Sequence, residues 1–519
     1  MKTITALALM AFGLLAVSTA CGDDGAESSD DIKPSVTVSL RSQSISEGEE
    51  VDASTSSLSL TYSVPVNLAS AAAITLNGSA VQAARNPRDV TGVTITLSLE
   101  EGKNYTLTIP AGSILASSDA TVSAPAFTLH FTTKAAPQPI SNDATALAKK
   151  LGWGWNLGNH FDTSSGEDGK PSQWGYWDNA VPTQKLYTNL KNAGVSTVRI
   201  CVTWGNYQTA DPWTIDANYM AEVKQNVDWA EAAGLNVILN MHHDEYWQDI
   251  KTAASNSVVN DQIKDRIAKT WTQIAVAFKD KGDFLFFESF NEVQDGQWGW
   301  GANLTDGGKQ YNTLNEWNQL VVNAIRATGG NNATRWIGVP AYASNPAFAI
   351  QSSFKLPDDP ASRIMVSVHY YDPNTFTLTP ENSDGKSEWG HTATAGKFAE
   401  GSNEEHVVDT FQKLQQTFVA NNIPVYIGEY GCVMHKNDRS NLFRNYYLEY
   451  VCRAAYTYNM PLCIWDNNST GGGNEHHGYF NHKDGTYLNG LGALVQTMIK
   501  AATSDDATYT LEAVYDKAP

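Results

Sequence analysis

The spacing of hydrophobic and polar residues changes character at about residue 135 of the chain. Before this point, short segments rich in Thr, Val and Ser alternate polar and apolar positions, and turn pairs such as Asn77-Gly78 separate them. A period of two residues is typical of strands with one buried face, and a series of short strands indicates an antiparallel sandwich. The sequence therefore predicts a small all-β sandwich over residues 35–134, with strands at 36–40, 58–66, 73–76, 93–99, 105–109 and 127–132.

Beyond residue 146, short apolar runs alternate with longer segments that carry hydrophobic residues at helical spacing. Gly194 and Gly234 each follow such a segment, as expected at the C-terminus of a helix. Eight buried strands that alternate with helices predict a closed parallel (β/α)8 TIM barrel of the α/β class, with no regular element after Thr503. We expect strands at 152–157, 197–202, 236–241, 284–289, 335–339, 364–369, 425–428 and 462–465, and helices at 184–193, 218–233, 262–278, 314–327, 406–420 and 441–456.

The composition changes at the same boundary. Residues 135–139 read Ala-Ala-Pro-Gln-Pro, which is typical of a linker, and all 15 tryptophans follow it. The sandwich resembles the immunoglobulin-like modules that precede bacterial surface enzymes, so we interpret it as a spacer, with carbohydrate binding or adhesion as alternatives. The expected organisation is a signal peptide at 1–20, an acidic tether at 21–34, an immunoglobulin-like sandwich at 35–134, a linker at 135–145 and a barrel at 146–519.

The N-terminus has the features of an export signal. Lys2 provides a positive charge, residues 4–17 form an apolar run that is too short to span a bilayer, and Ser18-Thr19-Ala20 precedes Cys21. This pattern resembles a bacterial lipoprotein signal, which implies lipidation of Cys21, and the following Gly-Asp-Asp resembles an acidic signal for the cell surface. A plain secretory signal with an incidental cysteine is the alternative.

The overall charge limits the classes of partner. The 519-residue chain is 42% hydrophobic and 17% charged, and its net charge of −20 argues against binding nucleic acid or an anionic membrane surface. A neutral polysaccharide is compatible with this charge. We expect a monomer with no cofactor, attached to a membrane only through Cys21.

The four remaining cysteines match no metal-binding motif. Most lie in or beside apolar strand segments, so buried free thiols are the favoured interpretation, although export would permit one disulfide. These residues are Cys201, Cys432, Cys452 and Cys463.

Two predicted strands deliver a glutamate at their C-terminal ends. The apolar run 284–290 continues into Asn291-Glu292, and the run 424–428 continues into Glu429. A buried carboxylate without a partner is costly, so a purely structural role is disfavoured for both. Two glutamates at the carboxyl ends of parallel barrel strands are what a retaining glycosidase requires.

Other strand ends carry further polar and aromatic residues in a recognisable order. The segments Gly-Trp-Asn-Leu-Gly-Asn at 154–159 and Val-His-Tyr-Tyr-Asp-Pro at 368–373 resemble endoglucanase branches of glycoside hydrolase family 5, and the resemblance extends from about residue 147 to the end. The positions that match the hallmarks of that family are Arg199, His242, Asn291, Glu292, His369, Tyr371, Glu429 and Trp465.

The resemblance implies a role for each of these residues. Glu429 is expected to be the nucleophile and Glu292 the acid/base, with their carboxyl groups about 5–5.5 Å apart. Arg199 and Tyr371 are suitable donors to hold the pKa of Glu429 down, and a setting beside His369 could raise the pKa of Glu292.

The other matched residues are expected to bind sugar. Asn291 suits the 2-hydroxyl next to the anomeric carbon, and Trp465 offers a flat face for the sugar at the cleavage site. His242 and His243 suit other hydroxyl groups. A metal site at this histidine pair is a weaker alternative, because no third ligand stands at a suitable spacing.

Aromatic residues after the strands indicate an open groove, although core packing is the alternative for each one. These residues are Trp177, Trp204, Tyr246, Trp247, Trp298, Trp300 and Trp389. The resemblance implies an endo-β-1,4-glucanase that acts on a β-glucan polysaccharide. The alternatives are an endo-xyloglucanase, a mixed-linkage glucanase, a β-mannanase, or a surface lipoprotein that binds glycans without cleaving them.

Overall fold

The computed structural model describes residues 36–69, 73–134, 143–163, 180–244 and 249–519. The predicted signal at 1–20, the lipidation site Cys21 and the tether at 21–34 lie outside the described residues. The chain divides into two compact units, one ending at Ala136 and the other starting at Pro137. Each unit has its own hydrophobic core.

The first unit is all β, as predicted. Its sheets have the strand orders β1-β3-β8-β7, β11-β10-β4 and β2-β12-β9-β5-β6, and the pairing is antiparallel except between β2 and β12. Alternate residues of the longer strands are buried, which gives the period of two seen in the sequence. The strands are β1 Leu40–Gln43, β2 Glu50–Val51, β3 Ser57–Tyr62, β4 Val66–Leu68, β5 Thr75–Leu76, β6 Ser79–Ala80, β7 Ala83–Arg85, β8 Gly92–Thr96, β9 Asn104–Ile109, β10 Ile114–Ala116, β11 Asp119–Ser123 and β12 Phe127–Thr133.

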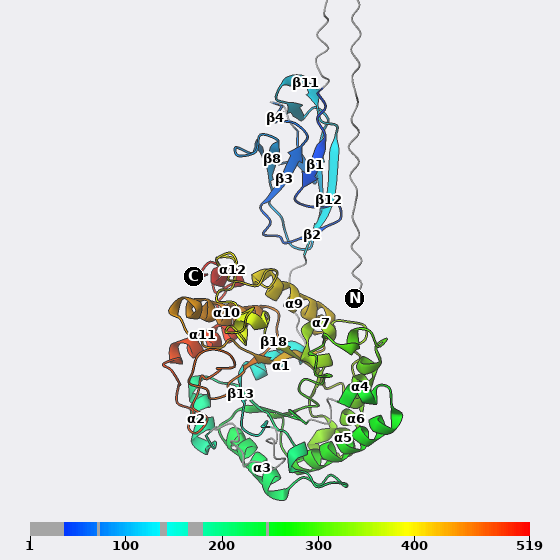
Figure 1. Cartoon of the computed structure of the whole chain (residues 1–519), viewed down its shortest axis with the longest axis vertical. Coiled ribbons are helices and arrows are strands. Elements are labelled where there is room, and N and C mark those ends of the chain that lie inside the picture. The colour runs from blue at the N-terminus through cyan, green and yellow to red at the C-terminus, as the bar shows by residue number, and fades with distance from the viewer. Residues whose placement is uncertain (1–35, 70–72, 135–142, 164–179, 245–248) are drawn as a thin grey trace, which may run out of the picture. The chain divides into compact units, whose positions relative to one another are not determined.

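The second unit is a closed barrel of eight parallel strands, and the prediction of a TIM barrel is confirmed. All eight strands match their predicted ranges to within two residues. Every residue in these strands is buried except Asn236, the first residue of β15. The helices surround these strands (Figure 1). The strands are β13 Trp153–Leu157, β14 Thr197–Ile200, β15 Asn236–Asn240, β16 Leu285–Glu288, β17 Ile337–Pro340, β18 Ile364–Tyr370, β19 Val425–Tyr430 and β20 Leu462–Ile464.

The six predicted helices are present with some different ends, and the unit also contains helices that the sequence did not predict. A helix begins at Asp143, inside the predicted linker, and another covers Leu511–Tyr515, so the prediction of no regular element after Thr503 is wrong. The Thr510 hydroxyl caps this last helix by accepting from the backbone of Ala513. The α-helices described are α1 Asp143–Leu151, α2 Gln184–Ala193, α3 Ala217–Ala232, α4 Ile250–Ala253, α5 Ser257–Phe278, α6 Lys309–Ala327, α7 Pro346–Ala349, α8 Asn374–Thr377, α9 Glu404–Thr417, α10 Asp438–Thr457, α11 Gly492–Thr503 and α12 Leu511–Tyr515.

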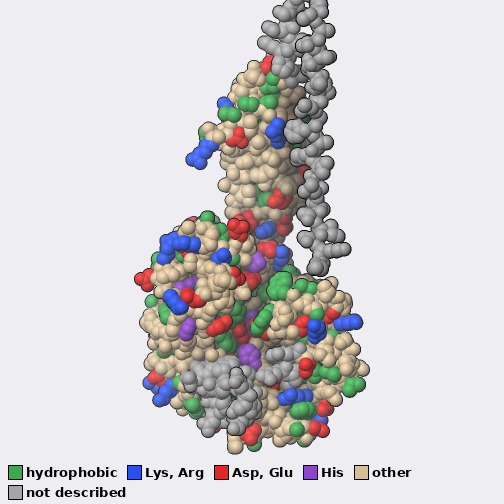
Figure 2. Space-filling model, viewed as in Figure 1, with side chains coloured by type: hydrophobic (Ala, Val, Ile, Leu, Met, Phe, Trp, Pro, Cys, Tyr) green, Lys and Arg blue, Asp and Glu red, His purple; other side chains and the backbone are tan. Residues whose placement is uncertain are grey.

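The strand register changes at the carboxyl end of the barrel. The pairing of β18 with β19 shifts between Val368 and His369, so that His369 lies opposite Glu429. An irregularity of this kind re-aims side chains at a strand end. Near its centre, one face of the unit is hollowed, and histidine and acidic side chains are visible along the hollow (Figure 2).

Two further sequence features can be compared with the structure. The cysteines at 201, 432, 452 and 463 are free and buried, as favoured. Among the described residues, every helix is too short or too polar to serve as a membrane span.

Candidate active site

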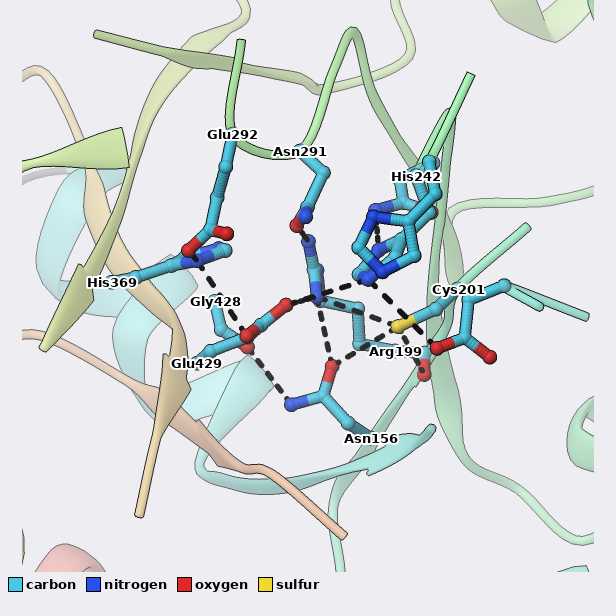
Figure 3. Close-up of polar contacts among 12 residues, drawn as sticks. Asn156, Arg199, Cys201, His242, Asn291, Glu292, His369, Gly428 and Glu429 are labelled. Atoms are coloured by element: carbon cyan, nitrogen blue, oxygen red, sulfur yellow. Dashed lines mark hydrogen bonds and ion pairs between the residues drawn. The ribbon is translucent and has the colours of Figure 1, made fainter. Parts of the chain in front are cut away.

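Two glutamates face one another at the carboxyl end of the barrel. Glu429 belongs to β19, and Glu292 follows β16 in the loop that leads away from it. One carboxylate oxygen of each lies within 4.8 Å of the other and of a ring nitrogen of His369. Their carboxyl groups turn toward the same space (Figure 3). This separation suits a retaining glycosidase, in which one carboxylate attacks and the other transfers a proton.

Arg199 of β14 is the cation at the base of this space. Its side chain is fully buried, and its Nη1 donates to Glu429 Oε1 at 2.8 Å. Burial alone lowers the pKa of the guanidinium, but the nearby carboxylates of Glu288 and Glu429 raise it well above its ordinary value. The arginine therefore stays charged and compensates the buried carboxylates.

Glu288 is a functional residue that the sequence reasoning missed. It ends β16 with its side chain fully buried, and it accepts from Arg199 Nε at 2.6 Å and from Nη2 at 3.2 Å. Ser367 Oγ donates to the same carboxylate at 2.8 Å. This forked ion pair fixes the plane of the guanidinium, and thereby the direction of its bond to Glu429. The sequence signal that could have identified Glu288 was the presence of an acidic residue inside the apolar run at 284–290, since a buried charge needs a partner.

The environment of Glu429 combines two donors with strong burial. The Tyr371 hydroxyl donates to Glu429 Oε2 at 3.0 Å, whereas Arg199 donates to the other oxygen of the same carboxylate, Oε1. Burial raises the pKa of Glu429 above its ordinary value, while His369 and Arg199 act against this rise and Glu292 adds to it. The prediction of a lowered pKa is therefore wrong, because desolvation outweighs the donors.

Glu292 has a different environment. Its Oε1 lies 2.6 Å from Nδ1 of His369, and its side chain is 17% exposed. Burial raises the pKa of Glu292 to about 7, whereas burial lowers the pKa of His369 to about 4. Glu292 is thus protonated below neutral pH beside an uncharged imidazole. It lacks the donors Arg199 and Tyr371 that Glu429 has, so the two carboxyl groups lie in different electrostatic environments.

Two asparagines complete the floor of the site. Asn291 accepts from Arg199 Nη2 at 2.7 Å through its amide oxygen, which leaves its NH2 group for a sugar hydroxyl. Asn156 of β13 accepts from Arg199 Nη1 at 3.0 Å and donates to the carbonyl of Gly428 at 2.9 Å. Asn156 therefore ties β13 to β19, the strand that carries Glu429, a role that the sequence did not indicate.

Trp465 follows β20 and forms one wall of the site. Its ring is parallel to that of His242, with an interplanar angle of 4° and 5.7 Å between centroids. A Cβ atom at Gly158 would lie 2.8 Å from the indole and 2.6 Å from the carbonyl oxygen of Asp466. Only glycine leaves room here. The segment directly after β13 therefore fixes the position of the Trp465 ring.

Known proteins resemble the barrel unit in sequence. The sequence profile described as "Cellulase (glycosyl hydrolase family 5)" matches residues 158–471, which include Arg199, Glu292 and Glu429. The chain belongs to glycoside hydrolase family 5. It is 32% identical over 379 residues to Endoglucanase A of Paenibacillus barcinonensis, an alignment that covers 68% of this chain and 90% of that protein.

Two solved structures of family 5 proteins resemble the chain. One is a GH5-4 broad specificity endoglucanase from Bacteroides salanitronis, with 45% identity and a TM-score of 0.66 over 71% of this chain and 97% of the other. The second is a Bacteroides ovatus xyloglucanase in complex with a XXXG heptasaccharide, with 26% identity and a TM-score of 0.63 over 90% of this chain and 100% of the other. The chain is therefore a cellulase-type glycoside hydrolase.

The histidine pair of this family 5 chain has a third potential ligand that the sequence did not reveal. Nε2 of His242 lies 4.0 Å from Asp162 Oδ2 and 3.8 Å from Glu429 Oε1. Donor atoms of Asp162, His242 and His243 lie within 4.8 Å of one another, as do those of Glu292, His369 and Glu429, so either trio could hold a metal ion. However, Asp162 already accepts from two backbone amides, and Nδ1 of His242 lies 3.0 Å from the Asn240 side chain.

The loop aromatics of the enzyme divide into two groups. Trp204 and Trp389 are buried in the core, where their indoles donate to the carbonyls of Asn240 and Ser402, so a groove-lining role for them is wrong. Trp298 and Trp300 are exposed. Trp177, Tyr246 and Trp247 lie outside the described residues.

Proposed function

We propose that the chain is a retaining endo-β-1,4-glucanase that cleaves cellulose-type β-glucans by double displacement, with Glu429 as nucleophile and Glu292 as acid/base. The observation that carries the proposal is the position of these two glutamates at the carboxyl end of the barrel, with one carboxylate oxygen of each within 4.8 Å of the other. Their different partners support the division of labour, because Arg199 and Tyr371 donate to Glu429, whereas Glu292 lies beside His369.

In the first step, the Glu429 carboxylate attacks the anomeric carbon and the bond from that carbon to the glycosidic oxygen breaks. Glu292 gives its proton to the leaving oxygen, so the aglycone departs as a neutral alcohol. Arg199 and Tyr371 orient the attacking carboxylate through bonds of 2.8 and 3.0 Å. The NH2 group of Asn291 donates to the 2-hydroxyl next to the anomeric carbon, a hydrogen bond that strengthens in the oxocarbenium-like transition state.

In the second step, Glu292 takes a proton from water, and the water oxygen attacks the anomeric carbon as the ester bond to Glu429 breaks. Esterification has removed a negative charge from within 4.8 Å of Glu292. This loss favours the ionised form of Glu292, which lowers its pKa and suits it to act as a base. Both carboxyl groups then return to their starting states.

Xyloglucan is a second candidate substrate on the same catalytic residues. The Bacteroides ovatus xyloglucanase aligns over 90% of this chain, which extends beyond the barrel, and the Bacteroides salanitronis relative has broad specificity. Purified enzyme should therefore be assayed on soluble cellulose derivatives, mixed-linkage glucan, xyloglucan and mannan. Product lengths separate internal cleavage from release of chain ends.

The catalytic assignment has its own test. A 2-deoxy-2-fluoro-β-glucoside or cellobioside with an activated leaving group should form a stable ester, and peptide mass analysis should find the sugar on Glu429. Glu429→Ala should release no reducing ends from soluble glucan while it still binds polysaccharide, and Glu400→Ala at an exposed loop position serves as the matched control. Hydrolysis at the parent rate by Glu429→Ala would reject the assignment. Label on another residue would reject it too.

We further propose that Cys21 carries a lipid anchor and that the all-β unit is an immunoglobulin-like spacer which holds the enzyme at the cell surface. The sequence around Cys21 and the separate core of the all-β unit support this proposal. Metabolic labelling with a fatty acid should mark the parent protein but not Cys21→Ser. Equal labelling of the two would contradict the anchor.

A further inference from the structure

A buried carboxylate follows the last barrel strand, and the mechanism proposed above gives it no task. Asp466 comes directly after Trp465, and its side chain is fully buried. Removal of a carboxylate from water is costly unless hydrogen bonds replace those to the solvent. The partners of Asp466 therefore show what the burial achieves.

One oxygen of this carboxylate joins the first barrel strand to the loop after the last one. Oδ2 of Asp466 accepts from Nε1 of Trp155 in β13 at 2.8 Å. The same oxygen accepts from the backbone amides of Tyr479 at 3.1 Å and Phe480 at 2.8 Å. The loop after β20 thus folds back onto Asp466, and Trp155 is bonded to the same oxygen.

The other oxygen holds the beginning of this loop and a histidine. Oδ1 of Asp466 accepts from the backbone amide of Asn468 at 2.9 Å and lies 3.2 Å from Nε2 of His482, which is fully buried. The His482 ring packs edge-on against Trp155, with 4.9 Å between the centroids and an interplanar angle of 82°. We call Trp155, Asp466 and His482 the closure cluster.

The closure cluster lies where the backbone pairing of the first and last strands ends. Trp155 of β13 lies opposite Ile464 of β20, and this is the final pair of their ladder. Beyond it, the amide of Gly158 donates to the carbonyl of Asp466 at 3.1 Å. This bond and the one from the Trp155 indole to the Asp466 carboxylate therefore continue the closure of the barrel past its strands.

Trp465 is held on both sides. Its own amide donates to the carbonyl of Tyr430 in β19 at 2.8 Å, and its neighbour Asp466 is bonded to the segment of the first strand. Its ring is parallel to that of His242, whose Nε2 lies 3.8 Å from Glu429 Oε1. The two attachments therefore determine where the indole lies relative to the nucleophile.

We propose that Asp466 is a positioning residue for Trp465, and that the closure cluster holds the indole in the orientation in which it contacts the sugar. This inference rests on the proposed function, which makes Trp465 a sugar-binding face. A fully buried side chain does not touch the substrate, so Asp466 acts through its neighbour. A carboxylate suits this task because both of its oxygens accept and neither donates.

Binding of cellotetraose, measured by calorimetry, tests this role. All proteins in the series carry Glu292→Gln, so that the ligand is not cleaved, and urea unfolding shows that each one is folded. Asp466→Ala should raise the Kd about three- to tenfold, because the indole loses its fixed orientation. Asp466→Asn keeps one acceptor oxygen, so its Kd should fall between those of alanine and the parent, and it replaces the alanine variant if that one does not fold.

A double-mutant cycle separates positioning from a general loss of stability. If Asp466 acts through Trp465, its replacement should change the Kd by less than about twofold in a protein that already carries Trp465→Ala. The matched control is Asp359→Ala. Asp359 is also a buried carboxylate, and it accepts from Arg326 Nε at 2.8 Å and from the backbone amide of Arg363 at 2.8 Å, in the segment that leads into β18 at the amino end of the barrel. This control should lower stability and leave the Kd unchanged.

The outcomes separate this inference from the proposed function. A parent-like Kd in both Asp466 variants would overturn the positioning role and leave the proposed function intact. An equal loss of affinity with and without the Trp465 indole would also overturn the positioning role. Absence of cellotetraose binding, together with absence of glucan hydrolysis by the unchanged enzyme, would overturn both proposals.

Discussion

Replacement of Glu292 by glutamine should stabilise the barrel unit in a manner that depends on pH. The pKa of Glu292 is about 7 in the folded protein, against 4.5 for the unperturbed group. Each unit between these two values corresponds to about 1.4 kcal/mol, so ionisation of Glu292 costs the folded state about 3 kcal/mol. Glutamine has nearly the same shape and never ionises.

The sign follows from proton linkage. Between the two pKa values, the folded protein holds the proton and the unfolded chain has lost it, so stability of the parent falls as the pH rises. The stability that the raised pKa of Glu292 contributes to the parent is fully present below about pH 4.5 and is lost above about pH 7. Glu292→Gln lacks this loss, so its advantage over the parent should be near zero in acid and approach about 3 kcal/mol at pH 8.

Tryptophan fluorescence suits the measurement, because all 15 tryptophans follow residue 152 and report on the barrel unit alone. Urea unfolding of the parent, Glu292→Gln and the exposed control Glu400→Gln should be compared at several pH values. The control should show no growth of its advantage with pH. A constant difference between Glu292→Gln and the parent from acid to pH 8 would refute the reasoning, since burial would then not disfavour the charged carboxylate.

Other predictions concern the rest of the site. Arg199→Met should destabilise the protein by about 3–5 kcal/mol, measured by urea unfolding, because two carboxylates lose their buried cation. Gly158→Ala should lower kcat/KM by about 100-fold, since its Cβ would displace Trp465, and cellobiose binding should weaken in parallel. The alkaline limb of kcat/KM should lie near pH 7 and follow Glu292. Deletion of residues 35–134 should leave hydrolysis of soluble glucan unchanged, and a large loss would contradict the spacer.

The barrel could be predicted because its strands are buried on both faces. Such strands appear in the sequence as continuous apolar runs, like that at 364–370, and they stand out from amphipathic helices. Helix ends were harder to place. The helix expected from residue 262 begins at Ser257, where the Asn256 side chain caps it by accepting from backbone amides, a local signal that hydrophobic spacing does not contain.

The outline of the site could also be predicted, since polar residues at barrel strand ends must converge. The partners across the barrel could not. The contacts of Arg199 with Asn156 and Glu288 join positions 43 and 89 residues apart, and they depend on how the barrel closes. Asp162 was missed for the same reason. The burial of Trp204 and Trp389 was unpredictable because loop residues can fold back onto the core.

The four buried thiols have a practical consequence. Each is buried at a different place: the Cys201 sulfur lies 3.4 Å from Nη1 of Arg199, and Cys452 on α10 lies beside the Tyr430 hydroxyl. Burial raises the pKa of each thiol, so alkylating reagents meet an unreactive, shielded group. The alkylation rate of each thiol therefore reports how often the structure around it opens, and no engineered cysteine is needed for the measurement. Alkylation should be slowest at Cys201, which lies next to Arg199 in the candidate active site.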